Sequence, residues 1–463
     1  MKTDTIAAIA TAMTNSGIGI VRISGEDACS IIDKIYCSKS GKKKLSAVPS
    51  HTVHYGYICD GEKIIDEVMV LIMKGPHSYT AEDTVEIDCH GGTLVMKRIL
   101  ETVIKYGARP AEPGEFTKRA FLNGRIDLSQ AESVIDVINA KNDFALESSM
   151  NQLKGKVKEE ISRLRGKIIH EIAFIESALD DPEHISIDGY SKELLGKMEE
   201  IQKDIKRLLE TSENGALLKE GINTVIVGKP NAGKSSLMNM LLGKERAIVT
   251  DIAGTTRDVL EEQINLNGIT LNVIDTAGIR ETEDVVEKIG VERAKSYLLK
   301  ADLIIYVVDS STVFDENDEE ILQMLAGRKA LVLLNKSDLS RVTTESEILA
   351  KLQEIEINPP ILEISAKEKT GMEALEKAVR ELFFAGEISF NDEVYITNVR
   401  QKAALQSALS DIRMVEESIQ NGMPEDFYSI DLMSAYEELG SIIGEAVGED
   451  LINEIFSSFC MGK

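Results

Sequence analysis

The stretch that most restricts the fold of this chain runs from Gly228 to Ser235 and reads GKPNAGKS. An apolar, β-branched run precedes it, and leucines and methionines at helical spacing follow it, so it connects a predicted strand to a predicted helix. In that setting glycines bring backbone N–H groups to phosphate oxygens, Lys234 reaches the outer phosphates, and Ser235 holds Mg²⁺. A plain glycine turn in an α/β domain is the alternative interpretation.

Three further motifs follow in order, each directly after an apolar run that predicts a strand. Asp275-Thr276-Ala277-Gly278 suits Mg²⁺ and the γ-phosphate. In Asn335-Lys336-Ser337-Asp338, the Asp338 carboxylate can accept from the N1–H and 2-amino groups of guanine, neither of which adenine offers. Ser365-Ala366-Lys367 suits backbone donation to guanine O6. The order of these motifs favours a GTP site over a plain turn.

A loop between the first two motifs, Thr250 to Asp258, contains Thr256, which we expect to complete the Mg²⁺ shell. Many GTPases place a water-orienting Gln after the Asp-x-x-Gly turn, but this chain has Ile279, so another group must orient the water. The residues predicted to contact GTP are Asn231, Ala232, Gly233, Lys234, Ser235, Ser236, Thr250, Asp251, Ile252, Ala253, Gly254, Thr255, Thr256, Asp275, Thr276, Ala277, Gly278, Asn335, Lys336, Asp338, Ser365, Ala366 and Lys367.

The periodicity of apolar residues predicts a multidomain α/β protein. Strand-like runs and one clear helix, about 93–106, predict an α+β domain over 1–120. Long amphipathic helices, about 150–179 and 192–210, predict the first half of a discontinuous all-α domain over 121–220. An inserted P-loop GTPase (Ras-like) domain with a doubly wound, mostly parallel sheet is expected over 221–385, and the second helical half over 386–463.

Composition excludes several classes of protein. The net charge of −26 makes the chain a poor free-standing binder of nucleic acid, and residues 1–120 hold 15 basic and 15 acidic residues, so the acidic excess lies beyond them. No apolar run is long enough to span a membrane. The start of the chain lacks a signal-peptide core, and five cysteines without a CxxC pair suit a reducing cytosol, so we expect a cytoplasmic protein.

Several motifs together resemble the tRNA-modification GTPase MnmE (TrmE) family over essentially the whole chain. The phosphate loop with Ser236 and the loop from Gly254 to Asp258 fit several GTPase families. The blocks that favour this family in particular are Pro76 to Asp83, His90-Gly91-Gly92, Gly114 to Asn123 and the C-terminal Phe459-Cys460-Met461-Gly462-Lys463.

The resemblance implies an enzyme that hydrolyses GTP with K⁺ stimulation when two G domains meet. With a flavin-dependent partner, MnmG, the family installs an aminomethyl or carboxymethylaminomethyl group at C5 of the wobble uridine in certain tRNAs. The carbon comes from a tetrahydrofolate derivative, 5,10-methylene or 5-formyl, and FAD enters only through the partner. We expect a homodimer formed through the first domain and a heterotetramer with MnmG. We expect no binding to a membrane. Given the acidic charge, we expect tRNA to bind mainly through the partner.

The resemblance also implies sites for K⁺ and for the attacking water. The K⁺ ligands fall on Asn231, Thr250, Thr255 and the backbone of Ile252, where a cation would offset charge that develops in the transition state. The water-positioning acid falls on Glu287, in the role of the absent Gln. From the residues alone, Glu287 beside Lys288 would be a solvated carboxylate on a helix.

The folate positions of the family fall on Arg22, Glu82, Arg125 and Lys463. The basic groups could pair with the glutamate carboxylates of folate, and Glu82 could accept from pterin N–H groups. Surface charges at 22 and 125, and a helix-start acid at 82, are the alternatives. Cys460 is either a catalytic nucleophile, a residue packed against the folate site or a plain tail residue.

A regulatory GTPase switch in ribosome assembly is the competing function. Such proteins usually append a basic RNA-binding domain, and no such composition appears here. Bound folate would distinguish the two functions.

Overall fold

A computed structural model describes residues 4–38, 43–184, 186, 189–243, 261–274, 301–384, 395–445, 447–457, 459 and 462. The chain divides into two compact units. The first comprises residues 1–138, 150–204 and 403–463, and the second comprises 139–149 and 205–402. In the described part of the chain, no helix combines the length and the apolar character needed to cross a bilayer.

The N-terminal part of the first unit is a seven-stranded sheet with two helices. The elements are β1 (Ile6–Ile9), β2 (Gly19–Ser24), α1 (Ala28–Ile35), β3 (Tyr36–Cys37), β4 (Thr52–Asp60), β5 (Lys63–Met73), β6 (Thr84–Cys89), α2 (Thr93–Lys105) and β7 (Arg109–Pro110). The strand order is β3-β4-β5-β6-β2-β1-β7, antiparallel except for the β1–β7 pair. Alternate apolar side chains of β2, β5 and β6 are buried together with those of α1 and α2.

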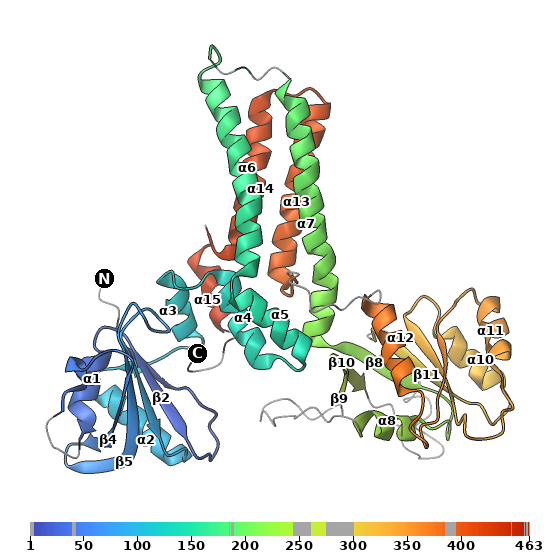
Figure 1. Cartoon of the computed structure of the whole chain (residues 1–463), viewed down its shortest axis with the longest axis horizontal. Coiled ribbons are helices and arrows are strands. Elements are labelled where there is room, and N and C mark those ends of the chain that lie inside the picture. Colours follow the sequence, from blue (N-terminus) through green and yellow to red (C-terminus); the bar gives the residue numbers. More distant parts are fainter. Residues whose placement is uncertain are drawn as a thin grey trace. The chain divides into compact units, whose positions relative to one another are not determined.

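Helices from both sides of the inserted segment form the rest of the first unit (Figure 1). The elements are α3 (Glu115–Leu122), α4 (Leu128–Asn139), α5 (Asp143–Leu153), α6 (Lys156–Asp180), α7 (Tyr190–Glu220), α13 (Val399–Gln420), α14 (Glu425–Ile443) and α15 (Glu449–Ser457), and α5, α7 and α13 continue into the second unit. The long helix α6 packs along α14, where Arg165 lies 3.9 Å from the centroid of the Tyr436 ring. The C-terminal helix α15 packs on α3, and its Phe456 is buried beside Ala120.

The second unit contains a six-stranded sheet with helices on both faces. The elements are β8 (Ile222–Val227), α8 (Lys234–Leu242), β9 (Glu261–Leu266), β10 (Ile269–Ile274), β11 (Leu303–Asp309), α10 (Glu316–Gln323), β12 (Ala330–Asn335), α11 (Glu345–Glu354), β13 (Ile361–Glu363) and α12 (Met372–Phe384). The strand order is β13-β12-β11-β8-β10-β9, parallel except for the antiparallel edge pair β9–β10.

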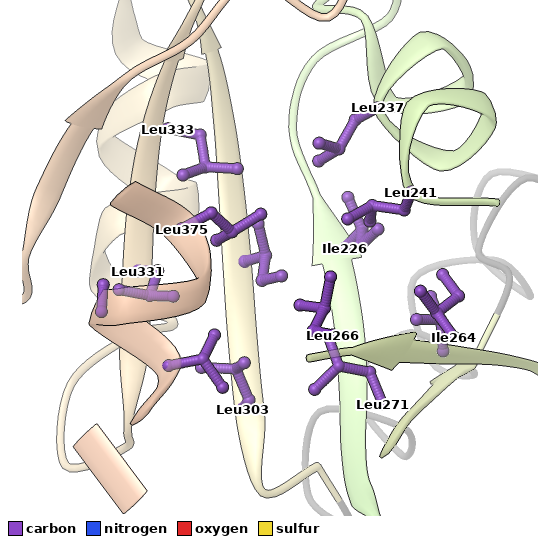
Figure 2. Close-up of a cluster of buried hydrophobic side chains, with 14 of the residues drawn as sticks. Ile226, Leu237, Leu241, Ile264, Leu266, Leu271, Leu303, Leu331, Leu333 and Leu375 are labelled. Carbon is purple, nitrogen blue, oxygen red and sulfur yellow. The ribbon is translucent and has the colours of Figure 1, made fainter. Parts of the chain in front are cut away.

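The central strands of this sheet are buried on both faces. On β11, Leu303 and Ile305 point into the core shared with α8 and α12, whereas Ile304 and Tyr306 point into the core shared with α10 and α11. Figure 2 shows the first of these cores, where Leu237 and Leu241 of α8 face the sheet. Such doubly covered strands explain the continuous apolar runs in the sequence. The arrangement confirms the predicted fold class.

The structure differs from the sequence-based expectations in several elements. The helix expected over about 150–179 is interrupted at Gly155, whose φ of +93° lies in the left-handed region, so α5 and α6 are separate helices. The helix expected over 192–210 extends from Tyr190 to Glu220 as α7. The edge strand β9 and helix α1 were not predicted, because elements of 6 and 8 residues are too short for the spacing of their apolar residues to distinguish helix from strand.

Candidate functional site

The phosphate-loop motif forms a turn between β8 and α8. Gly228 has a φ of +153°, and a Cβ there would lie 2.4 Å from the Val307 carbonyl oxygen. At Gly233, with φ of +101°, a Cβ would lie 2.0 Å from the Asn335 side-chain nitrogen. Both positions therefore require glycine, because any side chain would collide with neighbouring atoms and strain the backbone.

Lys234 lies with its ammonium group inside the loop. Its Nζ donates to the carbonyls of Gly228 at 2.7 Å and Lys229 at 2.8 Å. Burial lowers the pKa of Lys234, because a desolvated ammonium is costly. Phosphate oxygens would favour its charged form, and the exposed Ser235 at the start of α8 could hold Mg²⁺ beside them. These residues fit the predicted nucleotide and metal roles.

The predicted guanine-binding residues converge on the phosphate loop. The Asn335 side-chain nitrogen donates to the Ala232 carbonyl at 2.8 Å, and its oxygen accepts from the Ala366 amide at 3.0 Å. The Ser365 hydroxyl donates to an Asp338 carboxylate oxygen at 2.6 Å, which lowers the pKa of Asp338. Residues from three separate loops thus form one site at the C-terminal ends of β8, β12 and β13.

Lys336 adopts a left-handed backbone conformation, with φ of +65°, and forms an ion pair with Asp309 at the end of β11. Asp309 lies opposite Asn335 in the β11–β12 register and also accepts from the Ser311 amide at 2.9 Å. Sequence analysis missed Asp309, although its place at the end of an apolar strand run was a usable signal.

Several predicted site residues lie outside the described part of the chain. They are Thr250, Asp251, Ile252, Ala253, Gly254, Thr255, Thr256, Asp275, Thr276, Ala277, Gly278, Glu287, Cys460 and Lys463. The predicted roles of these residues stay predictions.

In the first unit, the structure brings Arg22 and Arg125 to the same aromatic ring. The guanidinium carbons of Arg22 and Arg125 lie 5.6 Å and 4.8 Å from the Tyr79 ring centroid. Arg22 also pairs with Glu86 at 2.7 Å and donates to the Gly462 carbonyl at 3.0 Å. Gly462, the residue before Lys463, packs so closely on β1 that a Cβ would lie 2.4 Å from the Ile9 carbonyl oxygen. Gly462 thus contacts the Arg22 side chain although the two residues lie 440 positions apart in the sequence.

Glu82 is held by a buried arginine that sequence analysis missed. The Arg119 guanidinium contacts the two Glu82 carboxylate oxygens at 3.2 and 3.1 Å, and the Ser24 hydroxyl donates to one of them at 2.8 Å. Arg119 also pairs with Glu115 and Asp4. A carboxylate has about four acceptor positions, so Glu82 retains acceptor capacity for a ligand.

Arg119 is fixed because it is only 8% exposed and bound by three acidic residues. A guanidinium buried in this way fixes the orientation of the carboxylates that it contacts and also neutralises their charge. Its position in the block from Gly114 to Asn123 was the available signal, but a sequence cannot show which acid an arginine will meet.

Family models and known proteins match this chain along nearly its whole length. A family model described as "GTP-binding protein TrmE N-terminus" matches residues 5–125, and one described as "MnmE helical domain" matches residues 128–460. The chain is 61% identical over 463 residues to "tRNA modification GTPase MnmE" of Lachnoclostridium phytofermentans, with 100% of both chains covered. Proteins with the same name from Alkaliphilus metalliredigens and Clostridioides difficile are 50% and 49% identical, with 99% of each chain covered.

Proposed function

The chain belongs to the MnmE family of tRNA modification GTPases, and from this premise we propose which cofactors, partner and chemistry serve its reaction. It is a GTP hydrolase that takes part in tRNA modification. We propose that, with the flavoprotein MnmG, it installs an aminomethyl or carboxymethylaminomethyl group at C5 of the wobble uridine of certain tRNAs. The carbon would come from a tetrahydrofolate derivative, and the site of action would be the cytoplasm.

The observation that carries the folate part of this proposal is the cluster of Arg22, Arg125 and Glu82 in one region of the first unit. Two guanidinium groups beside the Tyr79 ring suit an anionic ligand with an aromatic body, such as a folate. Glu82, held by Arg119, suits the N–H groups of a pterin. Lys463, next to Gly462, would add a further cation.

The nucleotide site supports the proposed use of Mg²⁺ and K⁺. Asn231, exposed at the crown of the phosphate loop with φ of +63°, could offer its amide oxygen to K⁺. Bound there, K⁺ would supply positive charge where the transition state develops negative charge. We propose that Thr250, Thr255 and the backbone of Ile252 complete the K⁺ ligands, that Ser235 and Thr256 hold Mg²⁺, and that Glu287 orients the water.

We further propose a homodimer through the first domain and a complex with MnmG that supplies most tRNA contacts. The net charge of −26 supports this division, because an acidic chain repels polyphosphate. The four-part domain division at 1–120, 121–220, 221–385 and 386–463 is likewise our proposal.

Folate binding tests the proposal against the alternative of a ribosome-assembly switch. The whole chain should bind 5-formyl-tetrahydrofolate in calorimetry, and Glu82→Gln should weaken binding by roughly tenfold or more. A glutamine has one oxygen acceptor where the carboxylate has two, so its NH₂ group would face a donor, either Arg119 or the ligand. The control is Glu62→Gln, an exposed acid of the same domain. Two results together would favour the ribosome-assembly switch. The chain would bind no folate, and the wobble uridine in tRNA from a deletion strain would still carry its normal modification.

A further inference from the structure

A continuous set of contacts joins the core of the second unit to the phosphate loop. Tyr306 of β11 is fully buried, and its hydroxyl donates to one Asp318 carboxylate oxygen at 2.6 Å. The other Asp318 oxygen lies 2.6 Å from the Nζ of Lys229, the second residue of the loop motif. Lys229 also pairs with Asp315 at 2.9 Å. The ion pairs of Lys229 therefore connect the phosphate loop to helix α10 and to its N-cap residue, Asp315.

The backbone of Lys229 carries this connection to the phosphate-binding lysine. Its carbonyl accepts from Lys234 Nζ at 2.8 Å and from the Ala232 amide at 3.3 Å. Any shift of the Lys229 main chain would therefore move the Lys234 ammonium and the crown that carries Asn231.

Asp318 is suited to act as an anchor. Only 1% exposed, it is the third residue of α10, where the positive end of the helix dipole favours a carboxylate. It also accepts from the Asp315 amide at 3.1 Å within a capping box. Its two oxygens are thus held by Tyr306, Lys229 and the helix backbone, so its position is strongly determined.

A lysine at this place in the loop could instead bind phosphate. Two carboxylates already neutralise Lys229, and they raise its pKa even though burial alone would lower it. Turning it toward a nucleotide would leave the buried Asp318 carboxylate without its cation, which is costly.

We propose that Lys229 and Asp318 are positioning residues for nucleotide binding, which fix the phosphate loop to α10 while the Lys229 side chain makes no phosphate contact. Their influence on the nucleotide passes through the Lys229 carbonyl and Lys234. Tyr306 supports the pair by orienting Asp318.

A double-mutant cycle tests this proposal. Lys229→Met and Asp318→Asn should each weaken GDP binding by roughly tenfold. The double variant should be no worse than Lys229→Met alone, because Lys229→Met already removes the contact with Asp318 as well as the one with Asp315. Lys229→Arg, which keeps a cation within reach, should restore most of the affinity. The matched control is Glu316→Gln, an exposed acid of the same helical turn, which should bind GDP normally.

Direct binding of phosphate by Lys229 predicts the opposite change in GDP affinity for one variant. If Lys229 contacted phosphate, Asp318→Asn would free that lysine and tighten GDP binding, and this result would overturn the proposal. Strictly additive effects would overturn it as well. Affinities are measured at a temperature where circular dichroism shows every variant folded. If Asp318→Asn does not fold, Tyr306→Phe takes its place: it removes one hydroxyl, so a smaller loss of affinity supports the proposal and an unchanged or tighter affinity contradicts it.

Discussion

The side chain of Asn335 donates a hydrogen bond to the main-chain carbonyl of Ala232 at 2.8 Å, across 103 positions of sequence. Because the same amide accepts from Ala366, it joins the phosphate loop to both predicted guanine-binding segments. The two ends of a bound nucleotide would therefore be held at a set spacing by one buried side chain.

Asn335→Ala should weaken binding of both GDP and GTP, because it leaves the Ala232 carbonyl and the Ala366 amide unpaired in a buried site. We expect a loss of about 2 kcal/mol, on the order of thirtyfold in affinity. Titration with a fluorescent guanine nucleotide measures it, and Asn317→Ala on the surface is the control. Unchanged affinity would show that the spacing does not depend on this amide.

Asp338→Asn should change the base specificity. Xanthine has an oxygen where guanine has its 2-amino group, so an asparagine NH₂ can donate to xanthine but repels guanine. The unaltered group is a carboxylate near neutral pH, as an aspartate ordinarily is, and the hydrogen bond from the Ser365 hydroxyl lowers its pKa further. We expect the KM for GTP to rise more than about tenfold and hydrolysis of XTP to appear. Retention of the normal KM for GTP would rule out guanine recognition by Asp338.

Hydrolysis should be faster in K⁺ than in Na⁺, and Asn231→Ala should remove most of that difference. An amide oxygen lost from a K⁺ site should cost on the order of tenfold or more in rate. Nucleotide affinity is measured beside the rate, and a loss of rate in K⁺ that exceeds any loss of affinity supports the K⁺ role of Asn231. Equal rates of the unaltered chain in both salts would contradict the K⁺ proposal.

Phe144→Ala should destabilise the second unit, because this ring lies in the core that also contains Leu271. It packs against the β9–β10 turn, where a Cβ on Gly268 would lie 2.3 Å from the ring. We expect a loss of about 3 kcal/mol. In calorimetry, the transition that GDP raises belongs to the nucleotide-binding unit, so the variant should lower that one.

Leu146→Ala, at a 41% exposed position of the same helix, is the matched control and should leave that transition nearly unchanged. Equal effects of the two substitutions would show that Phe144 is not part of this core.

Acid should destabilise the first unit in part through Glu115. Burial raises the pKa of this carboxyl, but hydrogen bonds from Arg109, the Glu112 amide and Arg119 outweigh it and hold the pKa below the ordinary 4.5. A lowered folded-state pKa contributes stability that is complete above pH 4.5 and is lost as the pH falls through the folded-state value. Denaturant unfolding at a series of pH values measures this loss.

Glu115→Gln should be less stable than the unaltered chain near neutral pH and should lose less stability below pH 4.5. Glu112→Gln, whose side chain is exposed, should follow the unaltered chain. Identical acid profiles for Glu115→Gln and the unaltered chain would remove Glu115 as a cause.

Much of the second unit could be predicted because its signals are local. A phosphate loop needs glycines at set positions between a strand and a helix, and Gly228 and Gly233 show the physical reason, since a Cβ at either would collide with a neighbour. The central parallel strands are buried on both faces, so each appears in the sequence as an apolar run.

The amino-acid sequence by itself determined the fold class, the nucleotide motifs and the family of this protein. Only the tertiary structure decided that Arg119 holds Glu82, that Asp318 takes the Lys229 cation and that Phe144 completes a core formed by distant strands. Charge pairs and core contacts of this kind depend on which side chains burial brings together. Residue type and spacing along a chain do not predict which distant side chains come into contact.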